Sequence, residues 1–390
     1  MNLWGNFTYF MEDTVNGDQV EQVDKRWIYG ANIRYQVHGS LAGLDMTNRF
    51  GVDIRFDDID EVALYKTRAL ERMGAVRSDA IEEGSIGLYW QNQIDLTDDL
   101  RSSFGLRYDY YDFAVANRVD TNVYGVDLGL NSGTTDDGLL SAKYSLGYTL
   151  NDNFEVYGSV GQGFHSNDAR GTTIAVDALN GSTLEPVAPL VESLGAELGL
   201  RSFWTDTLNL SAALWYLKLG SELIFVGDAG NTEPSGKSER MGLEVTAYYH
   251  LNQNWTVDLE YAISDSKYSD ELAEFDRIPG AIDKVLQMGL SADFDSGLYG
   301  SIRLRYFGER PLNESGDISS DSSTVVNLRT GYRWHDWTVT LDVLNLLDSD
   351  DHDIDYYYES QLANEPEPVA DFHFHPFEPR TARLTLSYKF

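Results

Sequence analysis

The most constraining feature of the sequence is an alternation of apolar and polar side chains, which recurs along the chain in segments of about ten residues. From Trp27 to Val37 the odd-numbered positions are apolar or aromatic, whereas the even-numbered positions from Gly30 to His38 are small or polar. Residues 86–96 alternate in the same way. Because successive side chains of a strand point to opposite faces, this pattern predicts strands with one apolar and one polar face. We count about 16 such segments and find no helical period of useful length between them.

The connectors between these segments alternate strictly between short and long. The short connectors 97–100 and 335–336 are followed by the long ones 116–138 and 349–378, and residues 57–83 are expected to form another long loop. Outer-membrane barrels have this arrangement, with tight turns on the periplasmic side and long loops outside. The sequence therefore predicts an all-β fold, a transmembrane antiparallel β-barrel. Its apolar face would meet lipid, and its polar, Gly-rich face would line a wet or plugged lumen.

Composition excludes several classes of protein. The chain has 390 residues and a net charge of −34, with 63 acidic against 29 basic residues, so nucleic acid is not an expected partner. It has no Cys, which removes disulfides and thiolate metal sites. No apolar run approaches the ~18 residues of a membrane helix.

The chain ends on a segment that alternates to its last residue. Ala382, Leu384, Leu386, Tyr388 and Phe390 share one face of this segment. A terminal strand that ends on an aromatic residue resembles the C-terminal signature of bacterial outer-membrane proteins, which their assembly machinery reads. We therefore expect Tyr388 and Phe390 to serve as an assembly signal, with an ordinary edge strand as the alternative.

Several short motifs, each weak alone, occur together in one characteristic order. They are GLRYDYYDF (105–113), GQGFHSNDARG (161–171), PLVESLGAELGLR (189–201), the stretch 221–245, RLRYFGERPL (303–312) and LDVLNLLD (341–348). Through these motifs the chain resembles the C-terminal barrel part of the TonB-dependent outer-membrane receptors, over most of its length. DIDYYYESQL (353–362) and HFHPFEPRTARLTL (373–386) are similar to one subgroup of these receptors.

The resemblance implies an architecture and a location. Such receptors have a signal peptide, a TonB box, an N-terminal plug domain and a barrel of about 22 strands. Residues 1–390 would then be the C-terminal part of such a barrel, a fragment without the plug and without about six of the strands. The expected location is the bacterial outer membrane.

The resemblance also implies a function: TonB-dependent uptake of a scarce ligand, such as a siderophore, a metal complex or another nutrient. The expected partners are that small molecule, the TonB complex acting through the missing plug, outer-membrane lipid and lipopolysaccharide, and the assembly machinery. A passive porin-like channel is the alternative function. An enzyme is not expected, because the sequence contains no G-x-S-x-G, H-E-x-x-H or P-loop motif.

Two long loops carry candidate ligand-binding residues at the extracellular mouth. The first begins with GFHSNDARG, in which His165, Asn167, Asp168 and Arg170 are candidate ligand contacts. The alternative is a local network in which Asp168 pairs with Arg170 or with a neighbouring loop.

The second loop, 349–378, is strongly acidic and aromatic. From Asp348 to Asp371 the chain has nine carboxylates and no Lys or Arg. Carboxylates with an imidazole suit a divalent cation or an iron complex, and tyrosines suit stacking on an organic ligand. The alternative is a solvated acidic loop that binds calcium loosely or pairs with lipopolysaccharide through it. The candidates are His352, Asp353, Asp355, Tyr356, Tyr357 and Tyr358.

The motif DFHFHPFEPR (371–380) places His373 and His375 two residues apart, which suits a metal site completed by His352 or His165. The alternative is a structural anchor above the barrel mouth, with Pro376 and Pro379 outside the paired sheet. No cofactor other than a loop-bound divalent cation is expected. Paired charges are expected to line the lumen: Arg34, Arg49, Arg55, Arg107, Arg303, Arg305 and Arg329, with Asp53, Asp109, Asp258 and Glu260.

Overall fold

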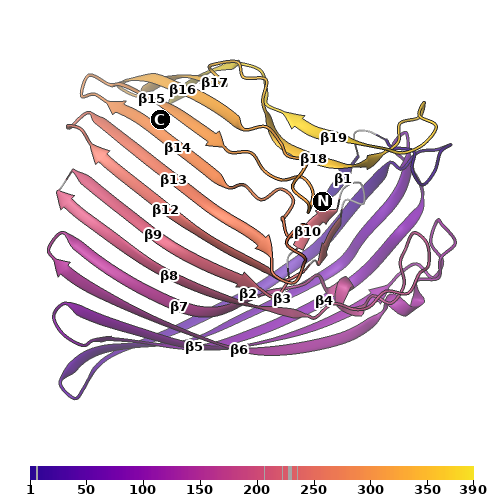
Figure 1. The fold of residues 1–390 in the computed structure, drawn as a ribbon, viewed down its shortest axis with the longest axis horizontal. Helices are drawn as coiled ribbons and strands as arrows, with labels where there is room; N and C mark the ends of the chain where they lie inside the picture. The colour runs from indigo at the N-terminus through magenta and orange to yellow at the C-terminus, as the bar shows by residue number, and fades with distance from the viewer. Residues whose placement is uncertain (6–7, 206, 222, 227–230, 235) are drawn as a thin grey trace.

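A computed structural model of the chain describes residues 1–5, 8–205, 207–221, 223–226, 231–234 and 236–390. Its main element is one antiparallel sheet of 16 strands, which are neighbours in chain order (Figure 1). The strands are β1 (Asn2–Trp4), β2 (Val20–Leu41), β3 (Leu44–Arg68), β4 (Glu71–Asp95), β5 (Leu100–Asn117), β6 (Gly133–Asn151), β7 (Phe154–Ser166), β8 (Leu190–Thr205), β9 (Leu208–Leu219), β12 (Ser238–His250), β13 (Trp255–Tyr268), β14 (Lys284–Asp293), β15 (Leu298–Phe307), β16 (Ser323–Trp334), β17 (Trp337–Leu344) and β20 (Thr381–Tyr388). The predicted all-β fold and its number of strands are confirmed.

The remaining elements lie in the long connections at one end of the sheet. Two hairpins are formed by β10 (Leu223–Val226) with β11 (Asn231–Pro234) and by β18 (His352–Ser360) with β19 (Val369–Pro376). The helical elements are a 3₁₀ turn and the five-residue helix α1 (Ala169–Thr173). No helix among the described residues is long and apolar enough to cross a membrane.

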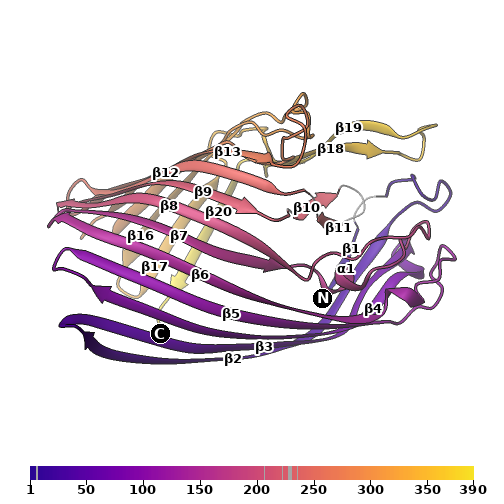
Figure 2. The ribbon, with the colours of Figure 1, turned by 60° about the horizontal axis from the view of Figure 1, so that its bottom comes forward.

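The sheet bends into the wall of a barrel, and its two edges lie apart (Figure 2). β1 pairs only with residues 21–23 of β2, so β2 from Asp24 onward has β3 as its one neighbour in the described sheet. β20 pairs only with β17 there. These two strands are therefore edge strands of the described sheet.

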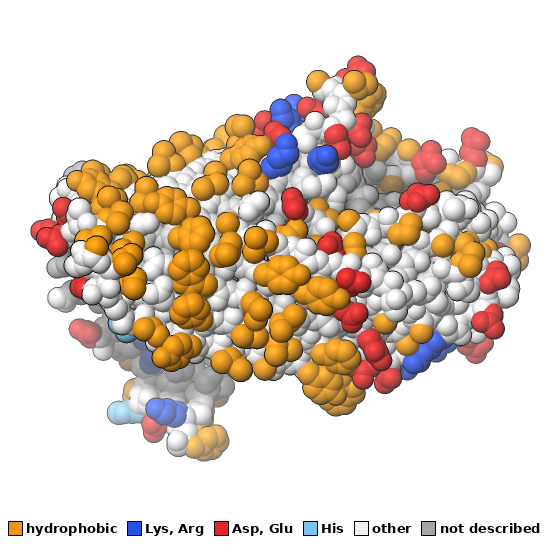
Figure 3. All heavy atoms as spheres, turned by 90° about the horizontal axis from the view of Figure 1, so that it is seen from below, with side chains coloured by type: hydrophobic (Ala, Val, Ile, Leu, Met, Phe, Trp, Pro, Cys, Tyr) orange, Lys and Arg blue, Asp and Glu red, His pale blue; other side chains and the backbone are white. Residues whose placement is uncertain are grey.

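The outer face of the wall is a continuous apolar band. One row runs in register across five strands, from Ile33 through Val52, Leu88 and Tyr108 to Leu140. Ile33 is 64% exposed and Leu140 58%, which for large apolar side chains indicates contact with lipid rather than with water. Figure 3 shows hydrophobic side chains gathered over one part of the surface, with acidic side chains more frequent outside that part. The predicted faces are confirmed.

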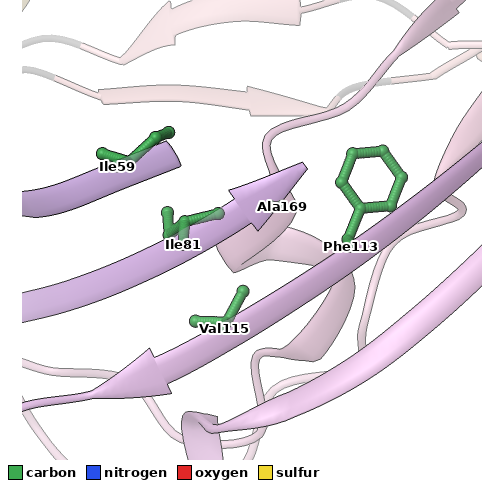
Figure 4. Close-up of a cluster of buried hydrophobic side chains, with 5 residues drawn as sticks. All are labelled: Ile59, Ile81, Phe113, Val115 and Ala169. Carbon is green, nitrogen blue, oxygen red and sulfur yellow. The ribbon is translucent and has the colours of Figure 1, made fainter. Parts of the chain in front are cut away.

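The prediction that residues 57–83 form a long loop is wrong. β3 and β4 continue through this stretch as a paired ladder and meet in a tight turn at Ala69 and Leu70, both with positive φ. Beyond the lipid, neither face has to be apolar, so the alternation disappears although the pairing continues. A small hydrophobic cluster holds this outer extension: Ile59, Ile81, Phe113 and Val115 on the lumen side of the wall enclose Ala169 of α1 (Figure 4).

On the lumen side, tyrosine rings lie flat over glycines of the neighbouring strand. Tyr89 is the cross-strand partner of Gly51, and a Cβ added at Gly51 would overlap the Tyr89 ring. Tyr157 covers Gly199, and Tyr299 covers Gly331, in the same way. Covering a strand glycine with a cross-strand aromatic ring protects the ladder and defines its register.

This arrangement predicts an asymmetric response to glycine substitution. In the purified protein in detergent micelles, Gly51→Ala should lower the free energy of unfolding by about 1–3 kcal/mol, because the Tyr89 ring must move. Urea unfolding, followed by intrinsic fluorescence, measures this change. Gly84→Ala in β4 is the matched control, because the nearest atom to its added Cβ lies 3.7 Å away. Equal effects of the two substitutions would contradict the packing role of the Tyr89 ring.

Candidate functional site

The candidate site is the end of the barrel wall where the long connections gather, which we call the outer mouth. Seven outer segments form its described part outside the β9–β12 connection: 5–26, 57–83, 111–138, 164–192, 265–284, 307–324 and 345–380. They contain 42 acidic and 13 basic residues, a net charge of −29 out of −34 for the chain. Such a charge imbalance in a concave mouth attracts cations and repels anions.

Most of the basic side chains in this mouth already have acidic partners. Among the described residues, eight of the 13 form ion pairs with carboxylates of the same segments. Lys66, for example, is almost fully buried and lies 2.7 Å from Asp13. The excess negative charge is therefore left to solvent and to ligands.

In the loop that follows β7, the local network left open by the sequence is present. Asp168 caps the N-terminus of α1 by accepting a hydrogen bond from the backbone N–H of Arg170, and it forms a bidentate pair with the Arg170 guanidinium at 2.9 and 2.6 Å. Desolvation alone would raise the pKa of Asp168, but the hydrogen bonds from Arg170 outweigh it and lower that pKa to about 2. Burial, with the nearby charge of Arg170, lowers the pKa of Arg77 to about 10.

His165 and Asn167 lie next to this pair but have different environments. Asn167 is 5% exposed and donates from Nδ2 to the Ala188 carbonyl oxygen at 2.8 Å, while its backbone N–H donates to Pro189. These bonds join the two ends of the loop. His165, the second-to-last residue of β7, is half-buried. The four candidates thus lie together at the start of one loop. Asp168 and Arg170 pair with each other there, and Asn167 hydrogen-bonds the start of the loop to its end.

The last outer connection is a hairpin and not an irregular loop. β18 and β19 pair from His352 opposite Pro376 to Ser360 opposite Val369. The expectation that Pro376 lies outside a paired sheet is therefore wrong, whereas Pro379 lies between β19 and β20, outside the paired strands. Pro376 occupies the end of the ladder, where its missing N–H removes no bond from the interior.

Stacked rings hold the histidines of this hairpin. The His373 ring stacks on Tyr358 at 3.8 Å between centroids, and Tyr9 meets the His373 ring edge-on at 5.8 Å. His352 stacks on Phe374 at 3.8 Å. Since Phe374 and His373 are adjacent in β19, His352 and His373 belong to opposite faces of the hairpin. The structure therefore does not bring these two histidines together.

Each histidine of the hairpin also has one polar partner. Nδ1 of His352 lies 2.7 Å from Asp355, and Nδ1 of His375 lies 2.9 Å from Asp353. Nε2 of His373 lies 2.9 Å from the Ser360 hydroxyl. Within the described ranges, no group of three or more His, Asp or Glu side chains is placed to hold a metal ion.

Three long-range contacts that the sequence did not predict fix the hairpin in the mouth. Arg310, in the loop after β15, forms a buried ion pair with Asp355 at 3.0 Å. On the other side, the hydroxyls of Tyr9 and Tyr358 are 3.3 Å apart, and the N–H of Phe10 donates to the carbonyl oxygen of Gln361. The hairpin thus bridges the loop before β16 and the segment before β2. No local sequence signal marks Arg310 or Tyr9 for this role.

Below the mouth, charge pairs line part of the lumen. Of the expected set, Arg55, Arg107, Arg303 and Arg329 form ion pairs, whereas Arg34, Arg49, Arg305 and Glu260 form none within the described residues. Arg107 bridges Asp53 at 2.6 Å and Asp109 at 2.7 Å. Arg303 lies 3.0 Å from Asp258. Other arginines stack on the tyrosines that cover glycine: Arg201 lies 4.4 Å from the Tyr157 centroid, and Arg333 lies 4.2 Å from that of Tyr299. The lumen wall is therefore highly charged but locally neutralised, unlike the mouth.

Comparison with known proteins gives a consistent result. The β-barrel family described as TonB dependent receptor-like matches residues 2–346. The pesticin receptors of Yersinia enterocolitica and Yersinia pestis are 26% identical over 191 residues, which is 47% of this chain and 26% of each receptor.

Solved structures share the fold at lower identity. The ferric yersiniabactin uptake receptor FyuA from Yersinia pestis has a TM-score of 0.71 at 17% identity, covering 95% of this chain and 55% of that one. The ferric-catecholate import receptor Fiu from E. coli K12 has a TM-score of 0.72 at 16% identity, covering 96% and 56%. This chain therefore spans about half of the length of these structures.

The environment of His373 predicts a pH-dependent hairpin. Burial lowers the pKa of His373 below its ordinary 6.5. The packed hairpin thus favours neutral imidazole, whereas a detached hairpin takes up a proton as the pH falls below 6.5. The facing groups are Tyr9, Tyr358, Ser360 and Asp371. Packing should therefore weaken as the pH falls below about 6.5, by at most about tenfold per pH unit.

Hydrogen-exchange protection factors of residues 352–376, corrected for intrinsic rates, measure this packing at pH 7.5 and 5.5. His373→Gln should remove the pH dependence. His375→Gln is the control, because His375 is largely exposed beside Asp353, and it should keep the dependence. A pH dependence that survives in His373→Gln would refute the assignment.

Proposed function

Because the chain belongs to the TonB-dependent receptor family, as part of its β-barrel, we propose that it forms the barrel wall of a receptor that takes up a scarce ligand across the outer membrane. One observation carries the proposal. The same strands present an apolar band to lipid, a neutralised charged wall to the lumen and a large folded mouth outside. Members of this family are proteins of the Gram-negative outer membrane, and the apolar band fits this location.

In the proposed mechanism, the mouth captures the ligand and the lumen conducts it. The candidate contacts are the hairpin residues His352, Asp353, Asp355 and Tyr356–Tyr358, together with the loop entrance at His165–Arg170. We propose that the TonB complex acts through a plug domain beyond residues 1–390, and that the lumen arginines exchange their local carboxylate partners for groups of that plug.

Further partners follow from the surfaces at the edge of the membrane. Phe390 contacts Tyr388 edge-on, and Tyr388 packs against Trp337, so the chain ends in an exposed aromatic group. We propose that this group is read by the outer-membrane assembly machinery. The carboxylates of the last hairpin favour contact with lipopolysaccharide through divalent cations. His373 and His375 remain candidates for a separate pair of metal ligands.

Two other functions receive less support. The family consists of transport receptors, so we propose no enzymatic activity. A passive porin-like channel has no support among the related proteins. Single-channel conductance in planar bilayers separates the two transport modes, because a stable, reproducible conductance step from this chain alone would favour the pore.

The uptake proposal predicts energy dependence. Cells that express the full-length receptor should accumulate ⁵⁵Fe from at least one of a panel of ferric chelates, and deletion of TonB should abolish this accumulation, because passage requires remodelling of the plug. The measurement is whole-cell uptake, with cells that lack the receptor as the control. Equal accumulation with and without TonB would rule out the proposal.

A further inference from the structure

A recess of the outer mouth lies between the loop that follows β13 and the loop that follows β15. It is distinct from the hairpin of β18 and β19. It has a volume of about 350 Å³ and is lined by Tyr268, Glu271, Phe275 and Glu314. Tyr268 is the last residue of β13, in regular register with β12, so it shares the lumen-facing side of the strand with Asp258. The recess therefore lies on the lumen side of the mouth.

Backbone hydrogen bonds hold the lining residues in place. The N–H of Tyr268 donates to the carbonyl oxygen of Asp276 at 2.7 Å, and the N–H of Phe275 donates to the carbonyl oxygen of Leu272 at 2.8 Å. The N–H of Arg277 donates to the carbonyl of Glu314 at 3.0 Å and so joins the two loops. The backbone of the recess is thus preorganised, so a ligand would have to order only its exposed side chains.

The lining combines aromatic rings with carboxylates that have no cation of their own. Tyr268 is 4% exposed and Phe275 48%, so one ring is fixed in the wall and the other is available at the surface. Neither Glu271 nor Glu314 takes part in an ion pair within the part of the chain that the structure describes. The nearby Arg277 instead lies 3.6 Å from Asp265 and 3.9 Å from Asp276.

This chemistry selects one class of ligand. An anion would be repelled by both carboxylates and by the net charge of −29 of the seven outer segments. A neutral apolar group would have to desolvate the carboxylates without compensation. A calcium ion takes six to eight oxygen ligands, of which two carboxylates supply at most four, and the Phe275 ring of the lining supplies none. An organic cation satisfies the carboxylates with its charge and the rings with its apolar surface and cation–π attraction.

We propose that this recess binds an organic cation, an alkylammonium or guanidinium group, with the charge between Glu271 and Glu314 and the apolar part against Tyr268 and Phe275. Only its biological role rests on the proposed uptake function, in which the transported ligand would carry such a group. Binding of the cation is a property of the folded mouth and is open to measurement without transport.

The test compares choline with its uncharged isostere 3,3-dimethylbutan-1-ol, titrated into the full chain in detergent micelles and followed by saturation-transfer NMR. Choline should bind at least about tenfold more tightly than the isostere, since cation–π attraction and charge pairing together are worth more than 1.4 kcal/mol. The double variant Glu271→Gln, Glu314→Gln should reduce this preference to near equality. Phe275→Ala should weaken both probes.

Glu274→Gln is the control for the Glu271 part of the double variant, because it removes one negative charge from the same loop as Glu271 without altering the lining of the recess. It should keep the preference for choline. Equal binding of the two probes to the unaltered chain would overturn the proposal. An equal loss in the Glu274→Gln control would also overturn it, because the attraction would then come from the whole acidic mouth. Loss of TonB-dependent uptake with retained choline preference would refute the transport function alone.

Discussion

The structure depends on main-chain hydrogen bonding between neighbouring strands. Lipid offers no partner for a peptide N–H or C=O, so each segment within the apolar band must pair with its neighbours along its whole length. In this chain the pairing runs in register across the sheet, as the row from Ile33 to Leu140 illustrates. The same constraint applies to the two edge strands, β2 and β20. In the described sheet, β2 beyond Asp24 pairs only with β3, and β20 pairs only with β17. The other edge of each strand therefore needs a partner strand from outside that sheet.

On this ladder of hydrogen bonds, the side chains face three environments: lipid, the lumen and the outer mouth. Lipid requires an apolar outer face, whereas the lumen tolerates charge provided that it is neutralised nearby. Arg107 with Asp53 and Asp109 shows this local neutrality. At the mouth the charges are not neutralised, because carboxylates outnumber Lys and Arg side chains in each of the seven outer segments. The net charge of the molecule is therefore a property of its outer end and not of the barrel.

The parts of the fold that the sequence predicts are those on which lipid imposes a period. The alternation from Trp27 to Val37 exists because one face must be apolar, and the structure confirms the two faces. Residues 57–83 lie beyond the lipid, where this requirement ends, so their pairing leaves no periodic trace. The last hairpin escaped prediction for the same reason, since both of its faces contain rings and carboxylates.

The candidate site was less predictable because it depends on contacts between distant segments. The pairing of Asp168 with Arg170 is local, and the sequence held it as an alternative. The ion pair of Arg310 with Asp355 joins residues 45 positions apart, and no sequence pattern near either residue predicts it. Tyr268, Phe275 and Glu314 come together where two loops are joined by backbone bonds, from Arg277 to Glu314 and from Gly280 to Pro311. Such a convergence requires the three-dimensional arrangement of the strands.

The contact between Tyr9 and Tyr358 has a structural consequence. These residues are 349 positions apart, and they join the segment before β2 to the hairpin before β20. At the outer end, the two sides of the described wall are therefore joined by ring contacts and the backbone bond from Phe10 to Gln361. In the wall beneath, every neighbouring pair of strands is joined by a ladder of hydrogen bonds. The first and last parts of the chain thus meet at the mouth, although β2 and β20 are not paired with each other in the described sheet.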